Sequence, residues 1–511
     1  MTSPIVPSAP VSSESIAHGS DQTSAAPFTA RVRSAVLWRW GAQVGSQLIT
    51  WTSTFLVVRL LEPTDYGLFA MSQVVLTALA FLNGQSFATS LIQASHVDER
   101  RIAQVFGMLL TFACALAAVQ VALAPFAAKY FGEPVVADML FVQAIIYLTI
   151  PFIALPTALL SRGLEFRRQA QSNMAGASLG AIIAPTLGYL GYGVWALVYA
   201  GVAIFVARAV LLSLAAQLWL RPAFDPRGAA DLIAFGGLLT LSQLFWIIQS
   251  QADIVIAGRL LPTYELGLYS QALFLTLIIT GRLLPPINEV AMAAYSELHR
   301  EGRPLAPYFL KTARLVMMVC APAYVGLALT SEAAILTLMG EQWRGSAPIV
   351  GGLALVMPAF ALHLICAPVT NAMGRARVSL FTAICGAIIM PCAFVWGIEA
   401  GTMGLVHAWW IAAPLLCAIT LTVTLPRIGA SPLDLLRELL PVALGCGLMT
   451  LGVTALQSAS DLAPPLTLLA SAALGAVIYA LTLWLVWRPA VVEAWAMLRS
   501  SSPSDSPTAS A

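Results

Sequence analysis

Apolar runs long enough to cross a lipid bilayer occupy most of this chain. A membrane-spanning helix needs about 20 mainly apolar residues, and fourteen such segments can be placed along the 511 residues. Only 10% of the residues are charged, against about a quarter in ordinary soluble domains, so lipid is the expected solvent. The sequence therefore predicts an all-α polytopic membrane protein. The predicted spans are residues 36–58, 67–92, 102–126, 136–160, 173–190, 194–219, 232–257, 267–288, 315–331, 348–370, 379–397, 403–425, 438–458 and 465–487.

The basic residues predict how these spans are oriented. An even number of spans puts both termini on one side, and short cytoplasmic loops accumulate Lys and Arg. With cytoplasmic termini, 19 of the 26 basic residues lie inside, and Arg39, Arg208 and Arg282 lie within spans or at their edges. The four outer basic residues are Arg59, Lys129, Arg259 and Arg344. This asymmetry predicts a multi-pass inner-membrane protein with both termini in the cytoplasm.

A sequence repeat divides the spans into two sets. RLLEPTDYGLF begins at Arg59 and RLLPTYELGLY begins at Arg259, so Arg-Leu-Leu and Gly-Leu-aromatic recur 200 residues apart. Both copies follow a span that starts in the cytoplasm, which predicts two six-helix bundles in parallel repeat plus a C-terminal helix pair. The predicted domains are a disordered cytoplasmic tail (1–30), the two bundles (31–220 and 231–426), a cytoplasmic linker between them (221–230), the helix pair (427–490) and a cytoplasmic tail (491–511).

Two polar stripes run along matched helices of the repeat. Residues spaced by three or four share one face of a helix, and polar side chains recur at that spacing in the first and seventh spans. Such faces are expected to point into the protein or a wet cavity. The stripes consist of Arg39, Gln43, Gln47, Thr50 and Thr54 in the first span, and of Gln243, Trp246, Ser250 and Asp253 in the seventh.

Arg282 is a further cation at membrane depth, in the eighth span. An intramembrane ion costs about 2.5 kcal/mol or more, so it usually faces protein or water. The planar guanidinium makes paired hydrogen bonds to phosphate, which predicts an anionic substrate group. We expect Pro285-Pro286 to break this helix and residues 289–314 to form a cytoplasmic loop at the headgroup level. The candidate substrate-binding residues are Arg39, Gln43, Gln47, Gln243, Trp246 and Arg282.

Two of these assignments have a plain alternative. Arg39 lies near the cytoplasmic end of its span, where a long side chain can reach the interface instead of a cavity. Asp253 is either an ion-coupling group or the ion-pair partner of Arg259 or Arg59. The default interpretation of Arg59 and Arg259 is an ion pair at a helix end.

Motifs for catalysis and metal binding are absent from the sequence. There is no P-loop, HExxH or GxSxG segment, and the seven cysteines are scattered singly. No outer loop is long enough for a catalytic domain. The sequence therefore predicts a protein that is not an enzyme, with no catalytic residue, metal or cofactor. The net charge of +2 gives no reason to expect nucleic-acid binding.

The stretch RLLEPTDYGLFAM, Arg59 to Met71, resembles the signature of the polysaccharide transporter family. These are Wzx-type oligosaccharide flippases of the multidrug/oligosaccharidyl-lipid/polysaccharide (MOP) exporter superfamily. The stretch QADIVIAGRLL, Gln251 to Leu261, is similar to the family pattern at the matching place. The resemblance covers roughly residues 34–425, and the last helix pair is as in fourteen-helix members. The signature residues here are Arg59, Pro63, Asp65, Tyr66, Gly67, Arg259 and Gly267.

The resemblance implies a MATE-like fold and a flippase working by alternating access. Its substrate would be an undecaprenyl-pyrophosphate-linked oligosaccharide, moved from the cytoplasmic to the periplasmic leaflet for exopolysaccharide or O-antigen (lipopolysaccharide) biosynthesis. Arginines on the first and eighth helices, here Arg39 and Arg282, would hold the pyrophosphate. The resemblance also implies an H⁺ or Na⁺ gradient as driving force, and a polysaccharide polymerase and a chain-length regulator as partners.

Three other functions are alternatives to this one. A drug/cation antiporter of the same superfamily needs deep acidic groups, for which Asp253 is the candidate. A membrane polymerase or ligase for sugar lipids needs a long outer loop with acid/base side chains. A flippase for the peptidoglycan precursor shares the fold, but the signature favours exopolysaccharide.

Overall fold

The protein is built from helices and short connections. The computed structural model describes residue 45 and residues 47–80, 99–163, 165–217, 221–224 and 229–488, of which 229–243 and 376 are described by backbone alone. Within these ranges every regular element is a helix, so the all-α fold class is confirmed. The elements are an unlabelled helical stretch (47–60), α2 (Pro63–Ala80), α4 (Glu99–Phe131), α5 (Val135–Arg162), α6 (Phe166–Tyr189), α7 (Val194–Ala215), α8 (Ala229–Leu260), α9 (Thr263–Arg300), α10 (Ala306–Leu329), α11 (Ser331–Leu338), η1 (Glu341–Ser346), α12 (Ala347–Leu364), α13 (Cys366–Ala372), α14 (Ala376–Gly397), η2 (Ile398–Ala400), α15 (Gly401–Ile428), α16 (Pro432–Ala459) and α17 (Pro464–Val486).

Many of these helices have the length and apolar composition of membrane-spanning helices. Nine stretches of the described residues are long and apolar enough to cross a bilayer. The longest of them, Arg377–Ile428, covers α15 and all of α14 except its first residue. The composition of these helices agrees with a multi-pass membrane protein, and the number of fourteen spans stays a prediction.

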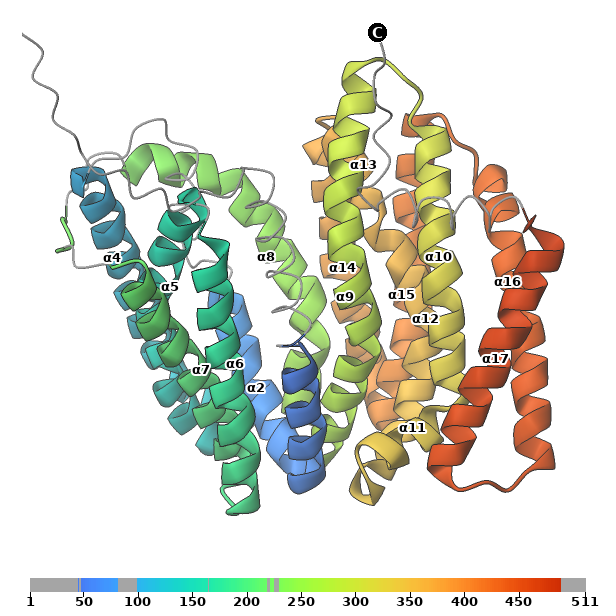
Figure 1. Ribbon diagram of the computed structural model, residues 1–511, viewed down its shortest axis with the longest axis horizontal. Coiled ribbons are helices and arrows are strands. Elements are labelled where there is room, and N and C mark those ends of the chain that lie inside the picture. The colour runs from blue at the N-terminus through green and yellow to red at the C-terminus, as the bar shows by residue number, and fades with distance from the viewer. Residues whose placement is uncertain are drawn as a thin grey trace, which may run out of the picture.

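The helices lie in two groups that meet at one end (Figure 1). α2 and α4 to α7 lie on one side, and α9 to α17 lie on the other. The lower ends of the groups come together around α2, α9 and α11, whereas the upper ends stand apart. α2 packs along α9, and α8 packs against α14. The α2–α9 contact therefore joins the two groups, through helices from distant parts of the sequence.

The path of α9 corrects two predictions. Pro285 and Pro286 lie inside one 38-residue helix, so they do not break it. The predicted loop at 289–314 is also wrong, because α9 continues to Arg300 and α10 begins at Ala306. Tyr295 is buried, and its hydroxyl donates to Thr312 Oγ1 at 2.9 Å. In an apolar surrounding no water competes for the remaining backbone hydrogen bonds, so a helix persists through prolines that would end it in solution.

Candidate functional site

A cavity of about 650 Å³ lies between the 47–60 helix and α2, α6, α7, α8 and α9. Small residues on α6 and α7, including Gly180, Ala181 and Gly201, leave room for it. Its described lining contains no charged side chain. The polar lining residues carry neutral hydroxyl and amide groups, which hydrogen-bond to sugar hydroxyls as well as to water. They are Thr50, Ser53, Thr54, Tyr66, Gln73, Thr77, Ser250, Gln251, Ser270 and Gln271.

Gln47 and Arg282 meet next to this cavity. When the Gln47 amide is oriented so that its oxygen faces both donors, this oxygen accepts from Arg282 Nη2 at 3.2 Å and from Trp51 Nε1. Gln47 lies one turn before Thr50, and Arg282 lies beyond Leu277 on α9. The contact therefore joins the first and eighth predicted helices at the end of the cavity away from the junction. Arg282 stays exposed, so its other donors are accessible.

Two glycines close the opposite end of the cavity. α2 and α9 cross so tightly that a Cβ on Gly67 would lie 2.1 Å from the Thr263 carbonyl oxygen. A Cβ on Gly267 would lie 1.7 Å from the carbonyl oxygen of Pro63. Real Cβ atoms do not approach a carbonyl this closely, so only glycine permits the crossing. The Gly-Leu-aromatic motif therefore has a packing role in both copies.

Two signature arginines fasten the same end. Arg59 Nε donates to the Leu338 carbonyl at 3.2 Å, and its Nη2 donates to Thr337, both at the C-terminus of α11. Arg259 Nη1 donates to the carbonyls of Lys129, at 3.3 Å, and Tyr130 near the C-terminus of α4. The expected ion pairs of Arg59 and Arg259 are thus replaced by hydrogen bonds to helix-end carbonyls. A cation there meets the negative end of a helix dipole, worth about 0.3–1 kcal/mol.

The segment after α11 completes this closure. Trp343 is fully buried, donates from Nε1 to the Val58 carbonyl at 2.8 Å, and packs edge-on against Tyr66 at 5.3 Å. Gln342 Nε2 donates to the Arg59 carbonyl at 3.0 Å. Since Tyr66 also lines the cavity, Trp343 lies directly behind the cavity wall at its closed end.

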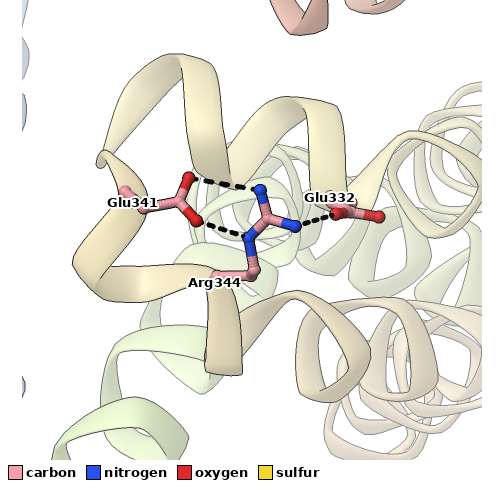
Figure 2. A network of polar contacts seen from close by, with 3 residues as sticks. All are labelled: Glu332, Glu341 and Arg344. Carbon is pink, nitrogen blue, oxygen red and sulfur yellow. Dashed lines mark hydrogen bonds and ion pairs between the residues drawn. The ribbon is translucent and has the colours of Figure 1, made fainter.

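A surface network holds α11 and η1 together (Figure 2). Arg344 Nε lies 2.7 Å from Glu341 Oε1, and its Nη1 lies 3.2 Å from Glu332 Oε1. All three side chains are exposed, so water and salt screen the attraction. The network can orient η1 while adding little to stability. The four predicted outer basic residues therefore lie in or against this closed end: Arg59 and Arg344 at α11 and η1, and Arg259 and Lys129 where α8 meets the end of α4.

Asp253 lies away from the cavity, within the α8–α9–α15 packing. It is 1% exposed, and its carboxylate accepts from the Tyr269 hydroxyl at 2.9 Å and the Ile254 amide at 2.8 Å. Trp409 Nε1 in turn donates to the Tyr269 hydroxyl at 2.9 Å. The alternative in which Asp253 pairs with Arg259 or Arg59 is therefore wrong. Neutral donors surround this carboxyl within the described part of the chain.

The other sequence candidates lie elsewhere. Trp246 lines a second, smaller cavity of about 110 Å³ together with Gln249 and His363. Arg39 and Gln43 lie outside the described residues, as does the side chain of Gln243. Across the described ranges, no three His, Cys, Asp or Glu side chains gather where they could share a metal ion.

Sequence reasoning missed several residues of the site. Gln73, Ser270 and Gln271 line the cavity, but single polar residues in apolar helices carry no pattern of their own. Gln342 and Trp343 reach residues more than 280 positions earlier. The sequence does carry one signal for the cavity wall. Gly176 and Gly180 are four residues apart, and small residues at this spacing mark close helix contacts in membranes. Gly180 lines the cavity.

Comparison with known proteins decides the family. The family model described as polysaccharide biosynthesis protein matches residues 56–348, which is more than half of the chain. The chain belongs to this polysaccharide biosynthesis protein family. The match begins just before the first signature segment and ends just after Arg344, so it contains the whole closed end described above.

Relatives along most of the chain agree with this membership. This polysaccharide biosynthesis protein is 25% identical over 492 residues to the succinoglycan biosynthesis transport protein ExoT of Rhizobium meliloti, covering 92% of this chain and 97% of ExoT. It is 23% identical to the teichuronic acid biosynthesis protein TuaB of Bacillus subtilis over 64% of this chain and 71% of TuaB. It is 19% identical to the lipopolysaccharide biosynthesis protein WzxC of Escherichia coli over 68% of this chain and 71% of WzxC.

Solved structures identify the fold of this family member. The lipid II flippase MurJ in an inward closed conformation superposes with a TM-score of 0.73 at 12% identity, over 89% of this chain and all of MurJ. An inward-facing MATE multidrug transporter of the MOP superfamily gives 0.59 at 16% identity, over 75% of this chain and 94% of that one. The predicted place among the polysaccharide transporters of the MOP superfamily is thereby confirmed.

Proposed function

We propose that this protein is a flippase for an undecaprenyl-pyrophosphate-linked oligosaccharide, which it moves from the cytoplasmic to the periplasmic leaflet. The observation that carries the proposal is a cavity sealed at one end and flanked by Arg282 at the other. The sealed end holds the four predicted outer basic residues. The cavity therefore faces the cytoplasm, where the substrate is made, in an inner membrane with both termini inside.

The chemistry of the cavity fits a sugar diphosphate. Neutral hydroxyl and amide groups such as Thr54, Gln73 and Gln271 offer hydrogen bonds to an oligosaccharide without selecting a charge. Arg282, held by Gln47, offers charge-assisted hydrogen bonds to the diphosphate. The lipid chain stays in the bilayer. No acidic side chain belongs to the described lining, so nothing there favours a drug/cation antiporter.

The closed end supports alternating access between two six-helix bundles. Gly67 and Gly267 are equivalent in the 200-residue repeat, and each contacts the counterpart of the residue that the other contacts. Arg59 and Arg259, also equivalent, each reach across to the other set of helices. This reciprocity is what a parallel repeat about an axis along the membrane normal produces. We assign residues 31–220 and 231–426 to the bundles and 427–490 to an appended pair.

The relatives indicate where such transport is used. ExoT is named for succinoglycan transport and WzxC for lipopolysaccharide biosynthesis. We infer that this protein serves exopolysaccharide or lipopolysaccharide assembly, alongside a polysaccharide polymerase and a chain-length regulator. It supplies no catalytic group. An H⁺ or Na⁺ gradient drives it, with Asp253 as the coupling residue.

A complementation experiment tests the role of the cavity. In cells that lack the protein, the wild-type chain should restore cell-surface polysaccharide, and Arg282→Ala should restore little of it at the same membrane level. Arg437→Ala is the matched control, since Arg437 is exposed at the start of α16. Full export by Arg282→Ala would remove Arg282 from the site. Normal polysaccharide in cells without the protein would contradict the function itself.

A further inference from the structure

Arg208 is an arginine at membrane depth that the proposed site does not use. It lies in α7, seven residues before the end of the helix at Ala215, which corresponds to about 10 Å along the axis. Its Nε donates to Asn173 Oδ1 at 2.9 Å, and its guanidinium lies 5.9 Å from the centre of the Phe205 ring. Among the residues that the structure describes, no carboxylate pairs with it. A charge at this depth without a counter-ion usually serves a ligand.

The α7 residues before Arg208 line the main cavity. Leu197, Gly201 and Ile204 recur along one face of the helix and all line the cavity wall. Arg208 follows Ile204 by four residues, so it occupies the next position on that face. It lies one turn closer to the predicted cytoplasmic end.

Asn173 continues the cavity face of α6 in the same way. Ala177, Gly180 and Ala184 line the cavity from α6, and Asn173 precedes Ala177 by four residues. Because α6 and α7 run in opposite directions, both steps lead toward the cytoplasmic end. The Arg208–Asn173 pair therefore lies at the rim of the cavity, just past its described lining.

The local packing holds the Arg208 side chain in place. A Cβ on Gly176 would lie 2.6 Å from Arg208 Cγ, so the aliphatic stem rests on the bare backbone of α6. Asn173 Oδ1 accepts the hydrogen bond from Arg208 Nε, and no described residue accepts a hydrogen bond from Nη1 or Nη2. The two terminal nitrogens are the donors that grip a phosphate in the forked geometry.

A second polar pair lies at the same level on the other helices. Gln47 precedes the lining residue Thr50 by three positions, and Arg282 follows the lining residue Leu277 by five. Both pairs consist of one amide side chain and one guanidinium. Both lie about one turn beyond the lining toward the cytoplasm.

We propose that Arg208 is a diphosphate-binding residue that acts with Arg282 at the cytoplasmic rim of the cavity. The inference rests on the proposed flippase function and deepens it. A diphosphate carries more than one negative charge, so two guanidinium groups from different helices neutralise it better than one. The amides of Asn173 and Gln47 orient the two cations without cancelling their charge.

Ligand binding to the purified full-length protein tests this inference. The probe is undecaprenyl diphosphate, with uncharged undecaprenol as reference, and affinity is measured by native mass spectrometry in detergent. R208Q should weaken undecaprenyl diphosphate binding by about tenfold or more, as expected for lost charge-assisted hydrogen bonds, and leave undecaprenol binding unchanged. N173A, which keeps the cation, should weaken diphosphate binding less, and R437Q should not affect it.

The outcomes separate this inference from the function on which it rests. Wild-type affinity in R208Q would overturn the role of Arg208 while the flippase function stands. A wild-type protein that prefers undecaprenol, or binds both lipids equally, would contradict the flippase function. If R208Q does not fold, R208K carries the test, because a lysine lacks the guanidinium fork. Reduced diphosphate affinity of R208K supports the proposal, and unchanged affinity overturns it.

Discussion

Gly67 and Gly267 pack reciprocally where α2 crosses α9: each lies against a carbonyl group four residues before the other glycine. Gly67 faces Thr263 and Gly267 faces Pro63, and the same 200-residue offset relates both pairs. The repeated motif thus meets itself at the closed end of the cavity. A backbone contact of this kind forms or separates as a unit, so in the proposed alternating-access cycle it would act as a gate.

Gly267→Ala should destabilise the closed end. Its Cβ would collide with backbone, which cannot move aside as a side chain does, and such overpacking costs about 1–3 kcal/mol. Gly281→Ala is the control on the same helix, since a Cβ there meets nothing within 4 Å and alanine favours helix by about 1 kcal/mol. Thermal unfolding in detergent should show a lower Tm for Gly267→Ala alone. Equal Tm values for the two variants would contradict the tight crossing.

Replacing both Arg59 and Arg259, which bind carbonyl groups at helix ends, should open the closed end of the cavity to the periplasm. In Arg59→Gln with Arg259→Gln, helix-end carbonyls of α11 and α4 lose their cationic partners. A cysteine placed at Ser270, in the cavity wall, then becomes reactive toward an impermeant maleimide added outside intact spheroplasts.

Labelling is counted above the parent chain, which has seven native cysteines. Asp461→Cys, in the exposed α16–α17 connection, gives the signal of an accessible outer position. The Ser270→Cys signal should be low with both arginines present and should rise toward this reference without them. High labelling with the arginines intact would mean that this end is not closed in the membrane.

Trp343 should stabilise the closure mainly through its ring. Trp343→Phe keeps an aromatic ring near Tyr66 but loses the hydrogen bond to the Val58 carbonyl, at about 1 kcal/mol. Trp343→Ala also leaves a hole at a fully buried position, and such changes cost about 3–5 kcal/mol. Thermal unfolding of the two variants should therefore rank alanine well below phenylalanine. Similar Tm values would show that the ring is not packed.

Asp253→Asn should uncouple export from the ion gradient. Its amide oxygen can still accept from Tyr269, so the variant should fold, but it can neither release a proton nor balance a cation. Its export should match that of the wild type with the gradient collapsed, and an ionophore should reduce it no further. Tyr269→Phe, which keeps the carboxyl, should still respond. An ionophore response in Asp253→Asn would make this residue structural.

Much of the fold follows from local patterns in the sequence. Apolar runs and basic loops do not depend on distant contacts, so the helical class and the grouping of Arg59 with Arg344 at one end could be predicted. The sequence shows that Gly67 and Gly267 occupy equivalent positions of the repeat. It does not predict that the two glycines pack together, because a sequence repeat carries no information on how its two copies contact each other. The structure also places Gln47 beside Arg282, and both belong to spans in which the sequence predicts substrate-binding residues.

The errors came where long-range packing overrides local rules. Proline breaks helices in water, yet α9 passes through Pro285-Pro286. Opposite charges close in the sequence predicted ion pairs for Asp253 and Arg259. In the structure the Asp253 carboxylate accepts a hydrogen bond from Tyr269, and the Arg259 guanidinium donates to a carbonyl at the end of α4. The sequence places Arg208 within a span or at its edge, but only the α6–α7 packing places it beside the cavity rim.

The leaflet on which lipid-linked sugars accumulate tests the flippase function most directly. Polyprenyl-linked sugars would be quantified by mass spectrometry in cells depleted of this protein, with their sidedness assayed in the same membranes. Full-length repeat units should accumulate on the cytoplasmic leaflet. Repeat units that reach the outer leaflet without polymerising would contradict the account and indicate a polymerase, and unchanged lipid-linked sugars would contradict it in favour of a drug/cation exporter.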